Sequence, residues 1–112
     1  MKIFGESPLF YNEVIDFIEL ENFERAIQSI KKNIDTLVNT DDIALAYLIC
    51  GFLNEKLEDN ISAINDFSKS ISIEAELDII NQRSKDVSLS GRSNAKYNNG
   101  DYQGAIEDKR KA

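Results

Sequence analysis

The sequence predicts an all-α fold built as a helical-repeat solenoid, and three observations support this prediction. The dipeptide Ala-Ile occurs three times in a similar setting, beginning at Ala26, Ala63 and Ala105. Apolar residues recur at intervals of three and four along most of the chain, as they do on one face of a helix. One proline and five glycines in 112 residues leave long stretches free to be helical. A helix opening that recurs at this interval is typical of helix pairs that stack on one another.

The composition favours a protein partner over nucleic acid or a membrane surface. Acidic residues number 20 against 13 basic ones, which gives a formal charge of −7. That charge repels phosphate backbones and anionic lipid, so we expect an apolar to basic protein segment, unless the charge serves solubility alone. The single cysteine, Cys50, cannot form an internal disulfide. Since the first ten residues do not resemble a signal peptide and no run is long enough to span a membrane, we expect a cytoplasmic protein.

Apolar spacing and capping residues divide the chain into a lead-in, residues 1–7, and one helical repeat domain, residues 8–112. Helices are predicted over 8–21, 22–34, 43–57, 60–73 and 101–112. The segment 74–98 keeps a helical rhythm without a fixed register. We expect it to be a helix that is interrupted or bent near Ser90 and Gly91, and that ends at Gly100.

One segment carries a family resemblance. Residues 94–107, Asn-Ala-Lys-Tyr-Asn-Asn-Gly-Asp-Tyr-Gln-Gly-Ala-Ile-Glu, resemble the middle of a tetratricopeptide repeat. The alanines are spaced by 37 residues (Ala26 to Ala63) and by 42 residues (Ala63 to Ala105), whereas that family's period is about 34. The resemblance implies a right-handed α-α superhelix of about three units, 8–40, 41–75 and 76–112, the last one truncated.

The resemblance also implies how the helices of each unit pack. The family has a small residue twelve positions before the helix-opening alanine, here Val14, Gly51 and Ser93. It has large residues sixteen before and four after, here Phe10, Tyr47, Leu89, Ile30, Phe67 and, as an exception, Lys109. Two further departures are Asn54 and Lys96, which replace a large aromatic. Glu58 stands in a glycine slot, at a cost of about 1 kcal/mol if its backbone is left-handed.

In this family the first helix of each unit lines a concave binding face. The partner-binding residues implied here are Tyr11, Asn12, Ile15, Leu48, Ile49, Phe52, Asn94 and Tyr97. Leu48, Ile49 and Phe52 form an apolar stripe separate from the one facing the partner helix, so they are the expected anchors. Tyr11 and Ser90 stand where the family's carboxylate-clamping subset has basic residues, so we do not expect a clamp for a C-terminal tail.

Three occupants of that face remain open. It takes an apolar peptide or helix of another protein, or the chain fills it with Ile3 and Phe4 of residues 1–9 or with the long third-unit helix, or a second copy covers it. We favour an interaction module. The alternative is a homo-oligomerising module or a fragment of a longer repeat scaffold.

The side-chain inventory argues against an enzyme, a metal site or a cofactor. The chain has no histidine, so histidine-based triads, Cys-His dyads and histidine metal sites are excluded. No glycine-rich phosphate loop or calcium loop occurs. Cys50 is expected to be a small core residue rather than a nucleophile.

Overall fold

The computed structural model describes residues 10–76 and 82–112, with side chains for 11–73 and 86–112. These residues form an all-α fold, as predicted. In chain order the helices are α1 (Phe10–Glu19), α2 (Phe23–Asn33), the short 3-10 helix η1 (Ile34–Thr36), α3 (Thr40–Lys56), α4 (Asn60–Glu76), α5 (Gln82–Asn98) and α6 (Tyr102–Lys111). The lead-in, Ser7, Pro8 and the suggested filling of the face by Ile3 and Phe4 lie outside the described residues, as does the side chain of Phe10.

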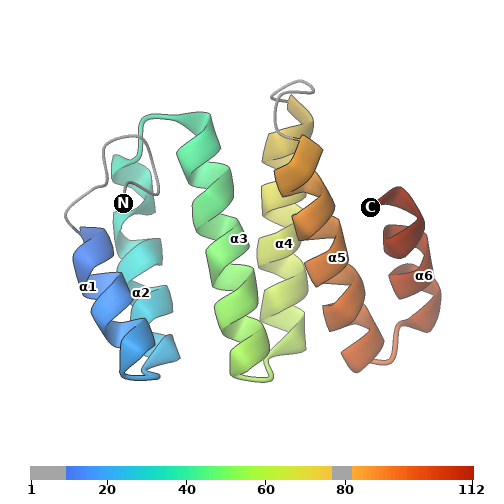
Figure 1. The fold of residues 1–112 in the computed structure, drawn as a ribbon, viewed down its shortest axis with the longest axis horizontal. Helices are drawn as coiled ribbons and strands as arrows, with labels where there is room; N and C mark the ends of the chain where they lie inside the picture. The colour runs from blue at the N-terminus through green and yellow to red at the C-terminus, as the bar shows by residue number, and fades with distance from the viewer. Residues whose placement is uncertain (1–9, 77–81) are drawn as a thin grey trace.

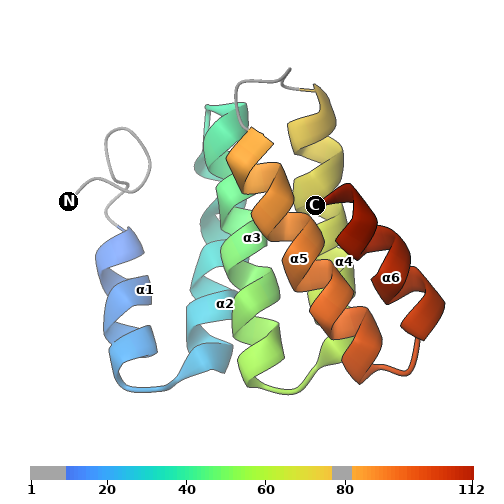
Figure 2. The same cartoon turned by 45° about the vertical axis from the view of Figure 1, so that its right-hand side comes forward.

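The α-helices follow one another in chain order across the molecule in Figure 1, and in the turned view of Figure 2 α5 lies between α3 and α4. Each helix packs mainly against its neighbours in the chain, and α3 also contacts α5. The molecule measures 40 × 32 × 22 Å along its principal axes. α1 and α6 stand at opposite ends of the row (Figure 1).

Of the two predicted alternatives near Ser90 and Gly91, an interruption or a bend, the interruption is wrong. α5 runs unbroken from Gln82 to Asn98 and passes through both residues. Glycine lowers helix propensity, but Gly91 is buried against another helix, where tertiary packing overrides the local preference.

The three turns that close the pairs α1–α2, α3–α4 and α5–α6 have the same construction. Five residues before each repeated alanine the backbone is left-handed, with φ of 58° at Glu21, 60° at Glu58 and 88° at Gly100. Glutamate therefore adopts the left-handed conformation at two of these three turns, at Glu21 and at Glu58, and glycine adopts it at the third. The next residue donates its N–H to a carbonyl five positions back, at 2.7 Å (Asn22 to Phe17), 2.9 Å (Asp59 to Asn54) and 2.8 Å (Asp101 to Lys96).

The same residues, Asn22, Asp59 and Asp101, then cap the following helix. Each side chain accepts a hydrogen bond from the backbone N–H three positions later, at 3.4 Å, 3.1 Å and 2.9 Å respectively. A left-handed residue followed by a cap ends one helix and starts the next with few unpaired backbone groups. The recurrence of Ala-Ile in the sequence therefore corresponds to a recurrent three-dimensional turn.

The core consists of two hydrophobic clusters that share α3. The first joins α1, α2 and α3, and its fully or nearly buried members include Tyr11, Val14, Ala26, Ile30, Cys50 and Leu53. The second joins α3, α4 and α5 through Leu48, Ala63, Phe67 and Ala95. Because α3 contributes to both, it is buried on two sides.

Phe67 fills the space where α3, α4 and α5 meet. Its side chain has no exposed surface. A Cβ built on Gly51 of α3 would lie 2.6 Å from the Phe67 ring, and one built on Gly91 of α5 would also lie 2.6 Å from it. Both distances are well inside van der Waals contact, so only glycine allows the two helices to approach the ring this closely.

Polar residues occupy the equivalent position three residues after each repeated alanine. These are Ser29, Asp66 and Asp108, and all three are buried. Ser29 donates to Glu13 of α1 at 3.3 Å. Asp66 accepts from Asn54 at 2.8 Å and from Lys31 at 2.6 Å. Each second helix is thus tied by a hydrogen bond to the first helix of its own unit.

Asp108 has the most extensive set of partners. Arg92 donates to both of its oxygens, at 2.8 and 2.7 Å, and Lys96 forms an ion pair with it at 3.1 Å. Arg92 also donates to Ser68 of α4 at 3.1 Å, so one side chain joins three helices. Burial alone would raise the pKa of Asp108, but the hydrogen bonds and charges of Arg92 and Lys96 outweigh it and hold that pKa below its ordinary value.

We predict that Gly91→Ala destabilises the protein by about 1–3 kcal/mol, because its methyl group overlaps the Phe67 ring. Helix propensity alone predicts the opposite, a gain of about 1 kcal/mol. Urea unfolding distinguishes the two. Ser90→Ala, at the exposed neighbouring position, is the control and should be neutral or slightly stabilising. A Gly91→Ala protein as stable as this control would contradict the packing described for Phe67.

We predict that Asp108→Asn costs about 3–5 kcal/mol at neutral pH, because it leaves Arg92 and Lys96 without their buried counter-charge. Since the folded-state pKa is lowered, the stabilisation is present above the unfolded value of about 3.9 and is lost as pH falls through the folded pKa. As the pH is lowered below 4, the free energy of unfolding should therefore fall less for the variant than for the parent. Glu107→Gln, an exposed neighbour on α6, should leave both quantities nearly unchanged.

Candidate functional site

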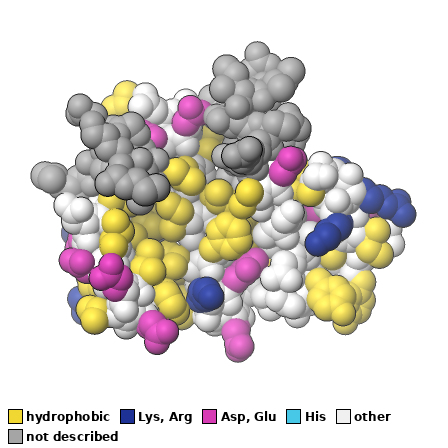
Figure 3. Space-filling view, viewed as in Figure 1, with side chains coloured by type: hydrophobic (Ala, Val, Ile, Leu, Met, Phe, Trp, Pro, Cys, Tyr) yellow, Lys and Arg dark blue, Asp and Glu magenta, His cyan; other side chains and the backbone are white. Residues whose placement is uncertain are grey.

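The helices α1, α3 and α5 each carry an exposed apolar side chain. We call the surface of these three helices the α1–α3–α5 face. The side chains are Ile15, Phe52 and Val87, at 39, 38 and 40% exposure. Figure 3 shows hydrophobic side chains gathered in the middle of this view, over α1 and α3, with acidic side chains along its lower edge. Apolar surface grouped in this way is typical of a contact site.

A groove runs between α3 and α5 on this face. Its volume is about 400 Å³, and its lining residues are Phe52, Glu55, Asp86, Val87, Ser90, Gly91 and Asn94. Phe52 is held by an edge-to-face contact with Phe67, with 5.0 Å between the ring centroids. The buried Phe67 ring thus fixes an exposed ring on the wall of this α3–α5 groove.

Glu55 differs from the other polar residues of the groove in that one of its carboxylate oxygens is shielded without a hydrogen-bond partner among the described residues. It is half-buried and accepts a hydrogen bond from Asn94 of α5. The shielded oxygen is Oε1. Burial raises the pKa of Glu55 above its ordinary value, against the opposing effects of the Asn94 hydrogen bond and the charge of Lys56.

The residues expected to bind a partner fall into two groups. Asn12, Ile15, Phe52, Asn94 and Tyr97 have exposed side chains, and Ile49 is half-buried. In contrast, Tyr11 and Leu48 are only 2% and 7% exposed, because each lies in one of the two core clusters, so neither offers surface to a partner. Leu48 is covered by the chain's own α4 and α5, since it packs with Phe67 and Ala95.

The resemblance places Glu55 and Ser90 on the concave face without counting them among the partner-binding residues, and it leaves out Asp86 and Val87, although all four line the groove. A signal for Val87 does exist in the sequence. It lies three and four residues before Ser90 and Gly91, on the same stripe of α5 and one helical turn earlier. Finding it requires knowing that α5 is continuous through Gly91.

Tyr97 belongs to a different hollow, between α5 and α6. This α5–α6 hollow has a volume of about 550 Å³ and is lined by Ser93, Asn94, Tyr97, Tyr102, Ala105, Ile106 and Lys109. The rings of Tyr97 and Tyr102 meet edge to face at 5.1 Å, and both side chains are more than half exposed. Asn94 borders both this hollow and the groove.

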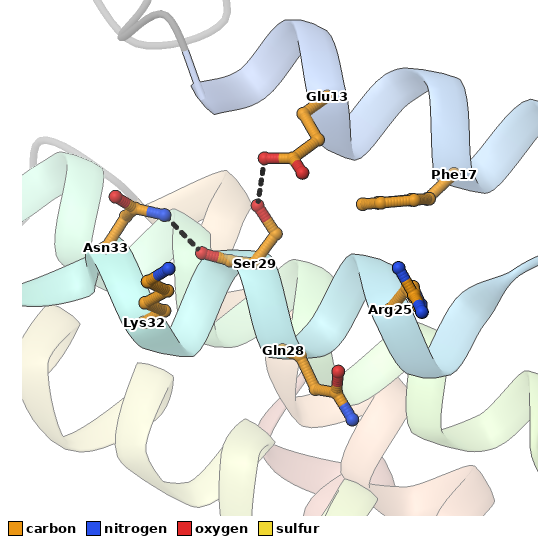
Figure 4. A pocket seen from close by; sticks show the side chains of 7 residues that line it. All are labelled: Glu13, Phe17, Arg25, Gln28, Ser29, Lys32 and Asn33. Atoms are coloured by element: carbon orange, nitrogen blue, oxygen red, sulfur yellow. Dashed lines mark hydrogen bonds between the residues drawn. The ribbon is translucent and has the colours of Figure 1, made fainter.

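A third hollow, of about 330 Å³, lies between α1 and α2 (Figure 4). Its polar groups bond to one another: Ser29 donates to Glu13, and Asn33 donates to the Ser29 carbonyl oxygen at 2.8 Å. Arg25 and Lys32 line it as well, together with Phe17 and Gln28. The bond from Ser29 to Glu13 joins α2 to α1, whereas the Asn33 bond lies within α2, so the hollow has a structural role through the first of them.

Cys50 lies in the first core cluster and has no exposed surface. Burial raises its pKa to about 12, and the nearby Asp66 charge contributes in the same direction. The side chain is therefore a neutral thiol at physiological pH, which is a poor nucleophile. Within residues 10–76 and 82–112, no three potential ligands among His, Cys, Asp and Glu are grouped so as to hold a metal ion.

Comparison with known proteins gives no family assignment. Neither a protein-family model nor a curated protein matches the chain at a significant level. Among the helices that the structure describes, none has the length and apolar character needed to cross a membrane.

We predict that Cys50 in the folded protein reacts with a disulfide reagent such as DTNB at least about a hundredfold more slowly than in the unfolded chain, because reaction requires the core to open. Absorbance at 412 nm measures the rate. A Cys50→Ser, Ser72→Cys protein, which carries its thiol at an exposed site on α4, should react rapidly without denaturant. Fast reaction of the native Cys50 would show that the first cluster is not closed.

Proposed function

We propose that this chain is a non-catalytic protein-interaction module of the tetratricopeptide type, and that it binds a protein or peptide segment on its α1–α3–α5 face. The repeat architecture is supported by three consecutive helix pairs whose turns share one backbone geometry and one capping pattern. In this proposal the pairs form a right-handed superhelix, and the protein acts in the cytoplasm.

The observation that carries the proposal is the α3–α5 groove with its apolar walls. Phe52 and Val87 expose more than a third of their surface across a hollow of about 400 Å³, and Ile15 of α1 is exposed to a similar extent. Such a surface fits a segment that presents apolar side chains at intervals, as an extended peptide or an amphipathic helix does. The net charge of −7 favours a neutral or basic segment over nucleic acid or anionic lipid.

A second candidate is self-association through the α5–α6 hollow. Tyr97, Tyr102 and Ile106 are 60, 58 and 47% exposed there, which is a large apolar area at one end of the row of helices. In this alternative a second copy, or further helices of a longer scaffold, covers that end. Sedimentation equilibrium at several concentrations, with Tyr102→Ser as the variant, separates this candidate from partner binding.

The test of the proposed function is selection of a displayed library of random 12-residue peptides on the immobilised protein. We expect enriched peptides with a common apolar spacing. Phe52→Ser and Val87→Ser should each weaken binding of these peptides about tenfold or more, since a central buried apolar contact is worth about 1.4 kcal/mol or more.

The matched control is Ile61→Ser, because Ile61 is 64% exposed on α4 and does not line the groove. It should bind the peptides as the parent does. Circular dichroism and urea unfolding of all variants establish that they fold. If no peptide is enriched, or if the control loses binding as much as the groove variants do, the proposal is wrong.

A further inference from the structure

The α3–α5 groove combines apolar walls with negative charge. Its described lining includes two carboxylates, Glu55 and Asp86, and no lysine or arginine. The α1–α2 hollow differs in this respect, since Arg25 and Lys32 accompany its single carboxylate. Carboxylates beside an apolar wall attract a cation whose stem is itself apolar, as the side chains of lysine and arginine are.

Glu55 is also an incompletely satisfied acceptor. Its carboxylate has one described hydrogen bond, from Asn94, and its Oε1 is shielded and without a partner among the described residues. A carboxylate offers about four acceptor sites, and a shielded acceptor without a donor is costly. The terminal torsion of glutamate is broad, so rotation about it presents an oxygen to the groove without moving α3.

The groove therefore favours a charged donor over a neutral one. A neutral donor would satisfy Glu55 but would bring no positive charge to a groove whose described lining has two carboxylates and no lysine or arginine. A cationic donor supplies both the hydrogen bond and the opposite charge. The apolar stem of the same side chain lies against Phe52 and Val87.

We propose that the α3–α5 groove is a subsite for a cationic side chain, lysine or arginine, of the bound segment, with Glu55 as its main acceptor and Asp86 as a second charge. The inference rests on the proposed function, because it assigns the chemistry of the segment that the α1–α3–α5 face binds. Glu55 thereby becomes the residue that determines specificity, and Phe52 and Val87 supply the apolar contact.

The experiment uses one peptide from the library selection that contains a lysine or arginine required for binding. A second synthetic peptide replaces that residue by norleucine or citrulline, which keeps the stem or the shape and removes the charge. Fluorescence anisotropy then gives the affinity of both peptides for the parent, Glu55→Gln, Asp86→Asn and Glu107→Gln. Glu107 is an exposed carboxylate on α6 outside the groove, so its variant controls for net charge.

We expect the parent to bind the charged peptide about tenfold more tightly than the uncharged one, as one charged hydrogen bond implies. Glu55→Gln should remove that preference, mainly by weakening the binding of the charged peptide. Asp86→Asn should reduce the preference by a smaller factor, and Glu107→Gln should leave it intact. Glu55→Gln is isosteric, and its unfolding midpoint verifies that the fold is retained.

Other results separate failure of the subsite from failure of the function. The proposed subsite is wrong if peptides bind and depend on Phe52 and Val87 but carry no required cation. It is also wrong if Glu55→Gln weakens both peptides equally. In both cases the proposed binding function is still supported. If no peptide is selected, or if binding is indifferent to Phe52→Ser and Val87→Ser, the proposed function fails and the subsite fails with it.

Discussion

The contact of the Phe67 ring with two glycine backbones is the constraint on which the rest of the structure depends. Gly51 and Gly91 admit the ring because neither carries a Cβ, and α3 and α5 are thereby brought to the same side of α4. This approach buries Leu48 and makes α3 a member of both core clusters. It also creates the groove, since Phe52 rests edge-on against Phe67 and faces Val87 of α5. The core packing and the wall of the α3–α5 groove therefore depend on the same ring.

Two departures from the tetratricopeptide pattern have a physical explanation in the polar contacts between helices. Asn54 and Lys96 replace a large aromatic, and each bonds to the buried aspartate of the next helix, Asp66 or Asp108. In the pair α1–α2 the position equivalent to Asn54 and Lys96 holds the aromatic Phe17. The position equivalent to Asp66 and Asp108 there holds the neutral Ser29, which is also buried. The substitutions thus act in pairs, since a buried carboxylate requires donors from the helix it faces. Asn54 and Lys96 depart from the pattern when each is taken alone, and the buried aspartate that each contacts explains the departure.

The sequence predicted the all-α class and five of the helices to within a few residues because those features depend on local chemistry. Apolar spacing, the caps at Asn22 and Asp101 and the repeated alanine act within a few residues of the chain. The exposure of the expected binding residues was predicted less well because it depends on packing between distant segments. Which stripe of α3 stays exposed is decided by where α5 lies, and α5 covers Leu48 while leaving Phe52 accessible. The partly unsatisfied acceptor at Glu55 likewise exists only once Asn94 lies opposite it.

The mainly sequential packing of the helices has a consequence for how the molecule opens. α6 packs chiefly against α5, and α1 chiefly against α2, whereas α3 has neighbours on both sides. In a linear array of this kind stability is a sum of terms between adjacent elements, so fluctuations begin at the ends. Amide protons of α3 and α4 should be the last to exchange with solvent. A segment bound across α3 and α5 would then have one of its two supports, α3, in the slowest-opening part of the chain, and fraying of α1 would leave it in place.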